Sequence, residues 1–213
     1  NIFDQWQLIL IFLSVGSMIL GAVAAIGQEN IKRLMAYSSI GHMGYALAGI
    51  LTGTIEGTKS TIIYLTIYAV MNVGIFACIF FMKRREKYVE DIKDLSGLSK
   101  TNPLLAVGFL IMLFSLAGIP PLAGFFAKFY IFVAVLDSKL YLLAVIGLVT
   151  TVISAFYYLR IVKIIYFDES KISFQNVKNL PLKFVLLTSS LIILLYCVYP
   201  SILIDMTSSI SLG

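Results

Sequence analysis

The chain has 213 residues, of which 60% are hydrophobic and 13% are charged, and its mean hydropathy is +0.96. This composition excludes a soluble globular domain and predicts an all-α integral membrane protein. The net charge of +5 does not indicate a nucleic-acid partner, because the sequence has no basic groove interleaved with aromatic residues and no glycine-rich phosphate loop.

The hydrophobic pattern predicts six membrane-spanning segments. They cover about residues 6–26, 34–51, 61–82, 102–136, 140–167 and 182–203. The first segment lacks a basic leading region and a small-residue cleavage site, so we interpret it as a span and not as a signal peptide. The chain begins at Asn1 instead of a methionine, which predicts a processed chain or a fragment of a longer one.

The basic residues predict the orientation of these spans. Of the 16 lysines and arginines, one is Lys128, two (Lys59 and Lys139) fall on one side, and the remaining thirteen fall on the other. The positive-inside rule then places the thirteen in the cytoplasm and both termini outside, which in a bacterium means the inner membrane and the periplasm. The connection Lys83–Thr101 mixes acids with these bases, and we expect it to be a solvated surface helix or loop.

A polar face follows the second segment. Ser38, His42 and Tyr45 recur at helical spacing, and His42 lies ~13 Å along the helix from Arg33, deep in the bilayer. Two interpretations of His42 remain open. It is either part of a proton relay or water chain, or a structural histidine that forms a hydrogen bond between helices.

A second polar stripe follows the third segment, where Tyr64, Tyr68 and Asn72 stand at positions i, i+4 and i+8. Such a stripe serves either proton transfer or aromatic packing. Cys78 and Cys197 lie inside spans without a CxxC motif or a histidine cluster, so metal, haem and disulfide interpretations are weak.

The segment 102–136 is too long for one straight crossing of a ~30 Å hydrocarbon layer. It contains the sequence GIPPLAG over residues 118–124. Pro120 and Pro121 remove backbone donors, and Gly118 and Gly124 permit unwound geometry. We therefore expect a discontinuous helix that is broken at residues 118–124.

Lys128 follows this break by one turn and is the only basic residue in the middle of a predicted span. A charged lysine at that depth costs roughly 3 to more than 10 kcal/mol, which makes it a candidate functional residue. The alternative is a lysine that snorkels to the membrane surface, but Asp137, the nearest loop charge, is ~13 Å away and the side chain reaches only ~6 Å.

Lys128 has no counter-charge within the predicted spans. Water and carbonyl groups must solvate its ammonium, or it releases its proton, which burial and the positive end of the second half-helix would both favour. The carboxylates all fall at or beyond segment ends: Asp4, Glu29, Glu56, Glu86, Glu90, Asp91, Asp94, Asp137, Asp168, Glu169 and Asp205.

Two long motifs resemble the antiporter-like proton-pumping subunits of respiratory complex I. They are NIKRLMAYSSIGHMGY at residues 30–45 and SLAGIPPLAGFFAKFYIF at residues 115–132. The resemblance implies a piece of a fourteen-helix fold with two inverted five-helix repeats. Residues 1–167 would form the second repeat, and residues 168–213 a cytoplasmic link and the final helix. Lys128 matches the proton-relay position on the broken helix of that repeat.

Departures from the family pattern point to its N-type subunit. The L and M types have histidines and a lysine on the helix where this chain has Tyr64, Tyr68 and Asn72, and the M type has a glutamate at the position of Lys128. These departures put a histidine relay on that helix in doubt. The essential groups of the first repeat have no counterpart here, so the chain resembles the carboxy-terminal part of the subunit.

The resemblance also implies partners. They are the other membrane subunits of complex I, the lipid bilayer and the missing amino-terminal half of the subunit, with quinone acting only indirectly. The chain itself would bind no flavin, iron–sulfur cluster or NADH, and so no cofactor. Two rival functions remain open: a sodium/proton antiporter or membrane-hydrogenase subunit of the same fold, and a non-transporting scaffold.

Overall fold

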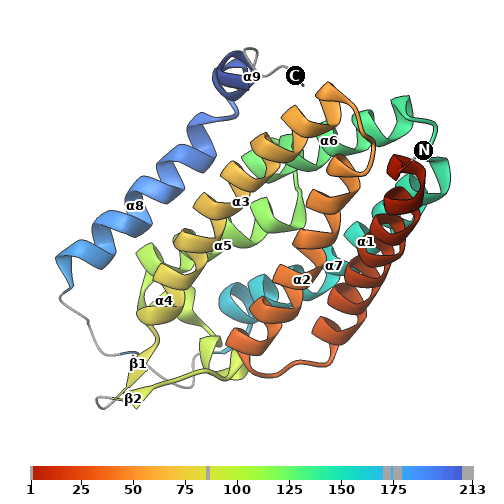
Figure 1. Cartoon of the computed structure of the whole chain (residues 1–213). Helices are drawn as coiled ribbons and strands as arrows, with labels where there is room; N and C mark the ends of the chain where they lie inside the picture. The colour runs from red at the N-terminus through yellow and green to blue at the C-terminus, as the bar shows by residue number, and fades with distance from the viewer. Residues whose placement is uncertain (1, 85–86, 170–173, 175–178, 208–213) are drawn as a thin grey trace.

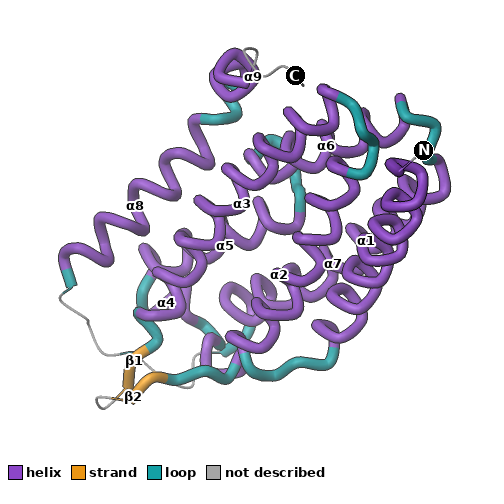
Figure 2. The backbone as a smooth tube through the Cα atoms, viewed as in Figure 1, coloured by secondary structure: helices purple, strands orange, loops and turns teal. Residues whose placement is uncertain are grey.

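The computed structural model describes residues 2–84, 87–169, 174 and 179–207. Its long helices are α1 (Ile2–Ile26), α2 (Ile31–Ile50), α3 (Ile55–Phe80) and α7 (Tyr141–Phe167), and helix dominates the tube in Figure 2. Among the described residues, three helices are long and apolar enough to cross a membrane: Trp6–Ile26 within α1, α3 and α7. The prediction of an all-α transmembrane fold is confirmed.

Helices α1 and α2 form an antiparallel pair with close backbone contact. A Cβ atom on Gly21 would lie 2.4 Å from the backbone nitrogen of Gly41, and one on Gly44 would lie 2.9 Å from the carbonyl oxygen of Ser14. Glycine allows this approach, which is how membrane helices gain packing energy where lipid is as apolar as their side chains. Helix α7 packs against α1 and also contacts α2.

The long fourth segment is divided into α5 (Pro103–Ala117) and α6 (Ala123–Asp137). Helix α6 packs against α3, and α5 packs against both α7 and α3. At the facing ends of α5 and α6, Ala117, Leu122 and Ala123 are buried, whereas Pro120 and Pro121 between the two helices are exposed.

The last segment differs from the prediction of a single helix over residues 182–203. The structure has α8 (Leu180–Leu195), turns, and then the short α9 (Ser201–Thr207). Pro200 lies between the two helices; it has no backbone donor and disfavours the helical conformation of the residue before it. At 16 residues, α8 is ~24 Å long and shorter than the ~30 Å hydrocarbon layer.

The connection between α3 and α5 is also more ordered than predicted. It contains the two-residue strands β1 (Lys83–Arg84) and β2 (Lys87–Tyr88), the 3-10 helix η1 (Ile92–Leu95) and α4 (Leu98–Thr101). The side chains of Ile92, Leu95 and Leu98 are at most 1% exposed. The expectation of a solvated surface helix or loop was wrong in its exposure for these residues, because their apolar side chains are buried in the hydrophobic core.

The two ends of the bundle carry different segments (Figure 1). The start of α1 and helix α9 lie at the upper end of that view, and β1, β2, α4 and the start of α8 lie at the lower end. The lower end holds the connection Lys83–Thr101, which carries many of the basic residues. This arrangement is compatible with the predicted sidedness of the chain.

Candidate functional site

The end of α5 explains how the chain accommodates a break at membrane depth. Gly118 adopts φ +84°, a left-handed conformation that favours glycine. The backbone N–H of Gly118 donates to the carbonyls of Phe114 and Ser115, and the N–H of Ile119 donates to Phe114. These bonds supply donors to two of the last four carbonyls of α5. The carbonyls of Leu116 and Ala117 need donors from elsewhere.

The start of α6 is held by the end of α5. The hydroxyl of Ser115 accepts a hydrogen bond of 3.0 Å from the backbone N–H of Gly124. A Cβ atom on Gly124 would lie 1.8 Å from the carbonyl oxygen of Ser115. Gly124 lies inside the first turn of α6, so its expected role in unwound backbone was wrong: it permits close contact between the two half-helices. The peptide bond between Pro120 and Pro121 is cis.

Lys128 supplies the missing donors. Its Nζ donates to the carbonyl oxygens of Leu116 at 3.1 Å and Ala117 at 3.3 Å. The residue is only 5% exposed, and its side chain runs past Gly118, where an added Cβ would lie 3.2 Å from its Cδ. This geometry does not fit a lysine that snorkels to the surface. No carboxylate in the described parts of the chain forms an ion pair with Lys128.

The electrostatic surroundings of Lys128 differ from the expectation. The sequence suggested that the positive end of the second half-helix would act on it. The Nζ atom instead lies at the carboxy-terminal carbonyls of α5, which form the negative end of that helix dipole. These carbonyls stabilise the ammonium form and offset part of the cost of burying the charge.

Tyr45 of α2 lies between Lys128 and the rest of the buried polar residues. The Nζ of Lys128 is 5.3 Å from the centroid of the Tyr45 ring, within the range of a cation–π contact. The hydroxyl of Tyr45 lies 3.0 Å from the hydroxyl of Thr150 and accepts a hydrogen bond of 2.9 Å from Thr151, both on α7. These bonds fix the ring against α7 and hold its face toward the lysine.

His42 forms the second part of the site. Its Nδ1 is 2.7 Å from the hydroxyl of Tyr64 on α3, and its Nε2 is 3.2 Å from the hydroxyl of Tyr158 on α7. The hydroxyl of Tyr158 also forms a short hydrogen bond with that of Ser38. A ring nitrogen between two hydroxyls can donate on one side and accept on the other. The chain Ser38, Tyr158, His42, Tyr64 is therefore a continuous hydrogen-bonded path across three helices.

The predicted tyrosine stripe on α3 is only partly at this site. The ring of Tyr68 stacks on His42 with centroids 4.7 Å apart, and its hydroxyl donates to Ser39 at 2.8 Å. Asn72 is half-buried, and within the described part of the chain no contact joins it to His42 or Lys128. The structure thus brings together Tyr64 and Tyr68 and leaves Asn72 apart.

Sequence reasoning missed the contribution of α7. Thr150, Ser154 and Tyr158 recur every four residues on an otherwise apolar helix, which is the same signal that identified His42. Ser115 was missed as well. Its role as a partner for the start of α6 depends on how the broken helix folds back, and that is not visible in a linear pattern.

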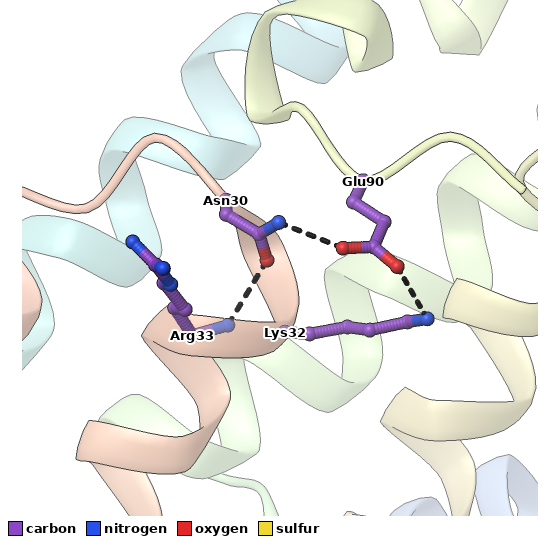
Figure 3. Close-up of polar contacts among 4 residues, drawn as sticks. All are labelled: Asn30, Lys32, Arg33 and Glu90. Atoms are coloured by element: carbon purple, nitrogen blue, oxygen red, sulfur yellow. Dashed lines mark hydrogen bonds and ion pairs between the residues drawn. The ribbon is translucent and has the colours of Figure 1, made fainter.

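The connection between α3 and α5 is held in place at the other end of the bundle (Figure 3). Glu90 accepts hydrogen bonds from Asn30 at 2.8 Å and from Lys32 at 2.7 Å. These two donors lower the pKa of the Glu90 carboxyl, with Lys32 contributing most. Asn30 also caps α2 by accepting a hydrogen bond from the backbone N–H of Arg33.

A second ion pair joins the same two segments. Lys93 donates to Glu29 at 2.8 Å and lowers the pKa of that carboxyl. Between the two pairs, the backbone N–H of Ile31 donates to the carbonyl of Glu90, and that of Ile92 donates to Glu29. The connection Lys83–Thr101 is thus tied by backbone and side chains to the turn between α1 and α2.

Comparison with known proteins gives relatives along the whole chain. Residues 2–154 match the family described as NADH:quinone oxidoreductase/Mrp antiporter, TM. The chain is 59% identical over 212 residues to NADH-quinone oxidoreductase subunit N of Pelagibacter ubique (strain HTCC1062), a match that covers 100% of this chain and 45% of that protein. It is 55% identical over 201 residues to subunit N of Parvibaculum lavamentivorans, with 94% and 42% covered. The chain spans less than half the length of these curated relatives.

Solved structures share the fold. A chain of respiratory complex I from Thermus thermophilus with bound NADH superposes with a TM-score of 0.82 at 27% identity, covering 96% of this chain and 44% of that one. A chain of the Mrp complex from Dietzia sp. DQ12-45-1b gives a TM-score of 0.83 at 21% identity, with 95% and 46% covered. The second likeness concerns the fold alone.

Proposed function

This chain belongs to the NADH:quinone oxidoreductase/Mrp antiporter transmembrane family, and we propose that it forms the carboxy-terminal part of a proton-translocating N-type subunit of NADH-quinone oxidoreductase. Residues 1–167 would be the second five-helix repeat of that subunit, and residues 168–213 the link and the final helix. The similarity to subunit N over 45% of its length supports this assignment.

One observation carries the proposed function. Lys128 is buried in the second half of a broken helix, and its only hydrogen-bond acceptors in the described structure are the end carbonyls of α5. An amine without a fixed counter-charge changes its protonation state readily when a charge nearby changes. In this proposal Lys128 takes up a proton when neighbouring groups become more negative, and releases it when they become more positive.

The hydrogen-bonded path at His42 would carry the proton to or from Lys128. The Tyr45 ring separates the two groups, so water must bridge them past the ring. At His42 the proton enters one ring nitrogen while another leaves from the opposite nitrogen to a tyrosine hydroxyl. Tyr64 and Tyr158 are placed to serve these two nitrogens. The path supports a subsidiary role for His42, because water can bypass a single imidazole.

The energy for transport would come from outside this chain. We infer that it binds no flavin, iron–sulfur cluster or NADH, and that the other membrane subunits of complex I transmit charge changes from a distant quinone site. The amino-terminal half of the subunit would supply the rest of the proton path. The protein would lie in a bacterial inner membrane, with the connection Lys83–Thr101 in the cytoplasm and both ends of this piece in the periplasm.

Cysteines introduced at Lys93 and Lys139 should then label from opposite sides of oriented vesicles. Labelling of both cysteines from the same side would refute this orientation.

The direct test is Lys128→Ala in the assembled complex, reconstituted into vesicles. We expect proton translocation and coupled quinone reductase activity to fall by about 100-fold or more per assembled complex, the lower end of the range for a lost proton-transfer group. Lys139→Ala, which removes an exposed lysine after α6, is the matched control and should leave both rates unchanged. Wild-type pumping by Lys128→Ala would rule out a relay and favour the scaffold alternative.

A sodium/proton antiporter subunit is the second candidate. It is favoured by the inclusion of Mrp antiporters in the matched family. The two candidates differ in the transported ion. Proton transport that persists in sodium-free buffer supports the respiratory assignment, whereas a strict requirement for sodium would support the antiporter.

A further inference from the structure

An apolar groove of about 550 Å³ lies between α5 and α8, away from Lys128 and His42. Its walls include Leu104 and Val107 of α5 and Leu187 and Leu191 of α8, which are 46–56% exposed. Apolar side chains this exposed on a membrane protein face lipid or a partner helix. The proton-transfer proposal does not use this groove.

The groove has the depth of one membrane leaflet. On α5 its lining extends from Asn102 to Ile111 and on α8 from Lys183 to Leu194, or ~14 and ~16 Å at 1.5 Å per residue. Half of a ~30 Å hydrocarbon layer is ~15 Å. If the starts of α5 and α8 lie at the membrane surface, a groove of this length reaches to about the midplane.

Positive charge is confined to the surface end of the groove. Lys183 lines this end together with Thr101 and Asn102, and none of the described residues that line the groove is a carboxylate. Within the described structure Lys183 forms no ion pair. Helices α5 and α8 both begin at this end, so the partial positive charges of two helix starts add to that of the lysine.

We propose that this groove binds an anionic glycerophospholipid, with one acyl chain between α5 and α8 and the phosphate beside Lys183. The leaflet depth, the apolar walls and the charge at one end all match this occupant. A partner helix is the competing occupant, and the experiment below distinguishes it from a lipid.

The test is crosslinking of lipid at the groove in the assembled complex. A cysteine replacing Leu187 is labelled with a photoreactive group, and the complex is placed in nanodiscs of phosphatidylcholine with a minor fraction of phosphatidylglycerol. We expect phosphatidylglycerol to be enriched among the crosslinked lipids relative to its share of the bilayer. Lys183→Gln should lower that enrichment about fivefold, the effect of one basic residue near an anionic surface.

Two matched controls separate this site from general effects. Lys100→Gln removes an exposed lysine at the same end outside the groove and should leave the enrichment unchanged. Val107→Trp fills the groove and should reduce all lipid crosslinks, whereas Val145→Trp, at an exposed site on α7, should not. The proposal is overturned if both lysine variants lower the enrichment equally, if crosslinked lipids mirror the bilayer, or if the label captures a protein chain instead.

Discussion

Lys128 and the end of α5 satisfy each other's polar groups. The carbonyls of Leu116 and Ala117 would lack donors without the lysine, and each unpaired buried group costs about 1–3 kcal/mol. The ammonium in turn would lack acceptors without these carbonyls. Removing the lysine eliminates the free-energy cost of burying its charge. It also leaves the two carbonyls without donors, which destabilises the fold, and the two effects largely offset each other. We expect Lys128 variants to assemble with modest changes in stability.

His42→Ala should slow proton translocation and not abolish it. The imidazole joins Tyr64 to Tyr158, but the space that it vacates can admit water, which transfers protons between the same hydroxyls. We expect a loss of less than about 100-fold, the lower bound for removal of many sole proton-transfer groups. The measurement is proton translocation per assembled complex, with Tyr68→Phe as a control that keeps the stacked ring. Complete loss of pumping in a normally assembled His42→Ala complex would contradict the subsidiary role.

At the scale of the helix, the broken segment was the most predictable feature and its internal packing the least. Two adjacent prolines and Gly118 mark a break on local grounds alone, because they act on the backbone of their own turn. Gly124 looked like a further part of the break. It lies in a regular helix that touches the backbone of Ser115, a tertiary contact that no local pattern reveals.

Gly124→Ala should destabilise the subunit. Its methyl group would lie 1.8 Å from the carbonyl oxygen of Ser115, so the two half-helices must move apart, and such overpacking costs about 1–3 kcal/mol or more. Gly16→Ala on α1 is the matched control, since its added Cβ meets nothing within 4 Å. We expect a lower thermal midpoint and less assembled subunit for Gly124→Ala only. Equal midpoints for the two variants would show that the half-helices are not in close contact.

Glu90→Gln should loosen the connection between α3 and α5. Because its donors lower the pKa of Glu90 in the folded state, the stabilising contribution is present above the unfolded pKa and is lost as pH falls through the folded pKa. Glu90 and Lys32 are about 40% exposed, so the effect should be local and modest. We would measure this loosening by hydrogen exchange at the amides of Ile31 and Ile92, corrected for intrinsic exchange rates.

In this exchange experiment the wild type should lose protection when the pH is lowered into the range where Glu90 becomes protonated. Glu90→Gln should be less protected already at neutral pH and should not show that acid-dependent loss. Asp94→Asn changes another acid of the same connection and is expected to behave as the wild type does. Unchanged protection in Glu90→Gln would mean that the backbone bonds hold the connection without the carboxylate.

At the scale of the whole molecule, the membrane class and the isolated lysine could be inferred from composition and charge, and the sidedness stays a prediction. The meeting of His42 with Tyr158 could not, because the residues are separated by 116 positions and come together only when α7 packs beside α2. The division of the last segment into α8 and α9 was missed because hydropathy continues across Pro200. Hydropathy reports burial in lipid, and it says little about where a helix ends.

The central claim is that the side chain at position 128 must gain and lose a proton, and Lys128→Arg tests it most directly. Arginine can donate to the same carbonyls of Leu116 and Ala117 and keeps the positive charge, but it does not release its proton. The measurement is the rate of proton translocation per assembled, reconstituted complex. We predict that this rate falls in Lys128→Arg as far as it does in Lys128→Ala. A wild-type rate in Lys128→Arg would contradict the account, because it would show that a fixed positive charge is sufficient at this position.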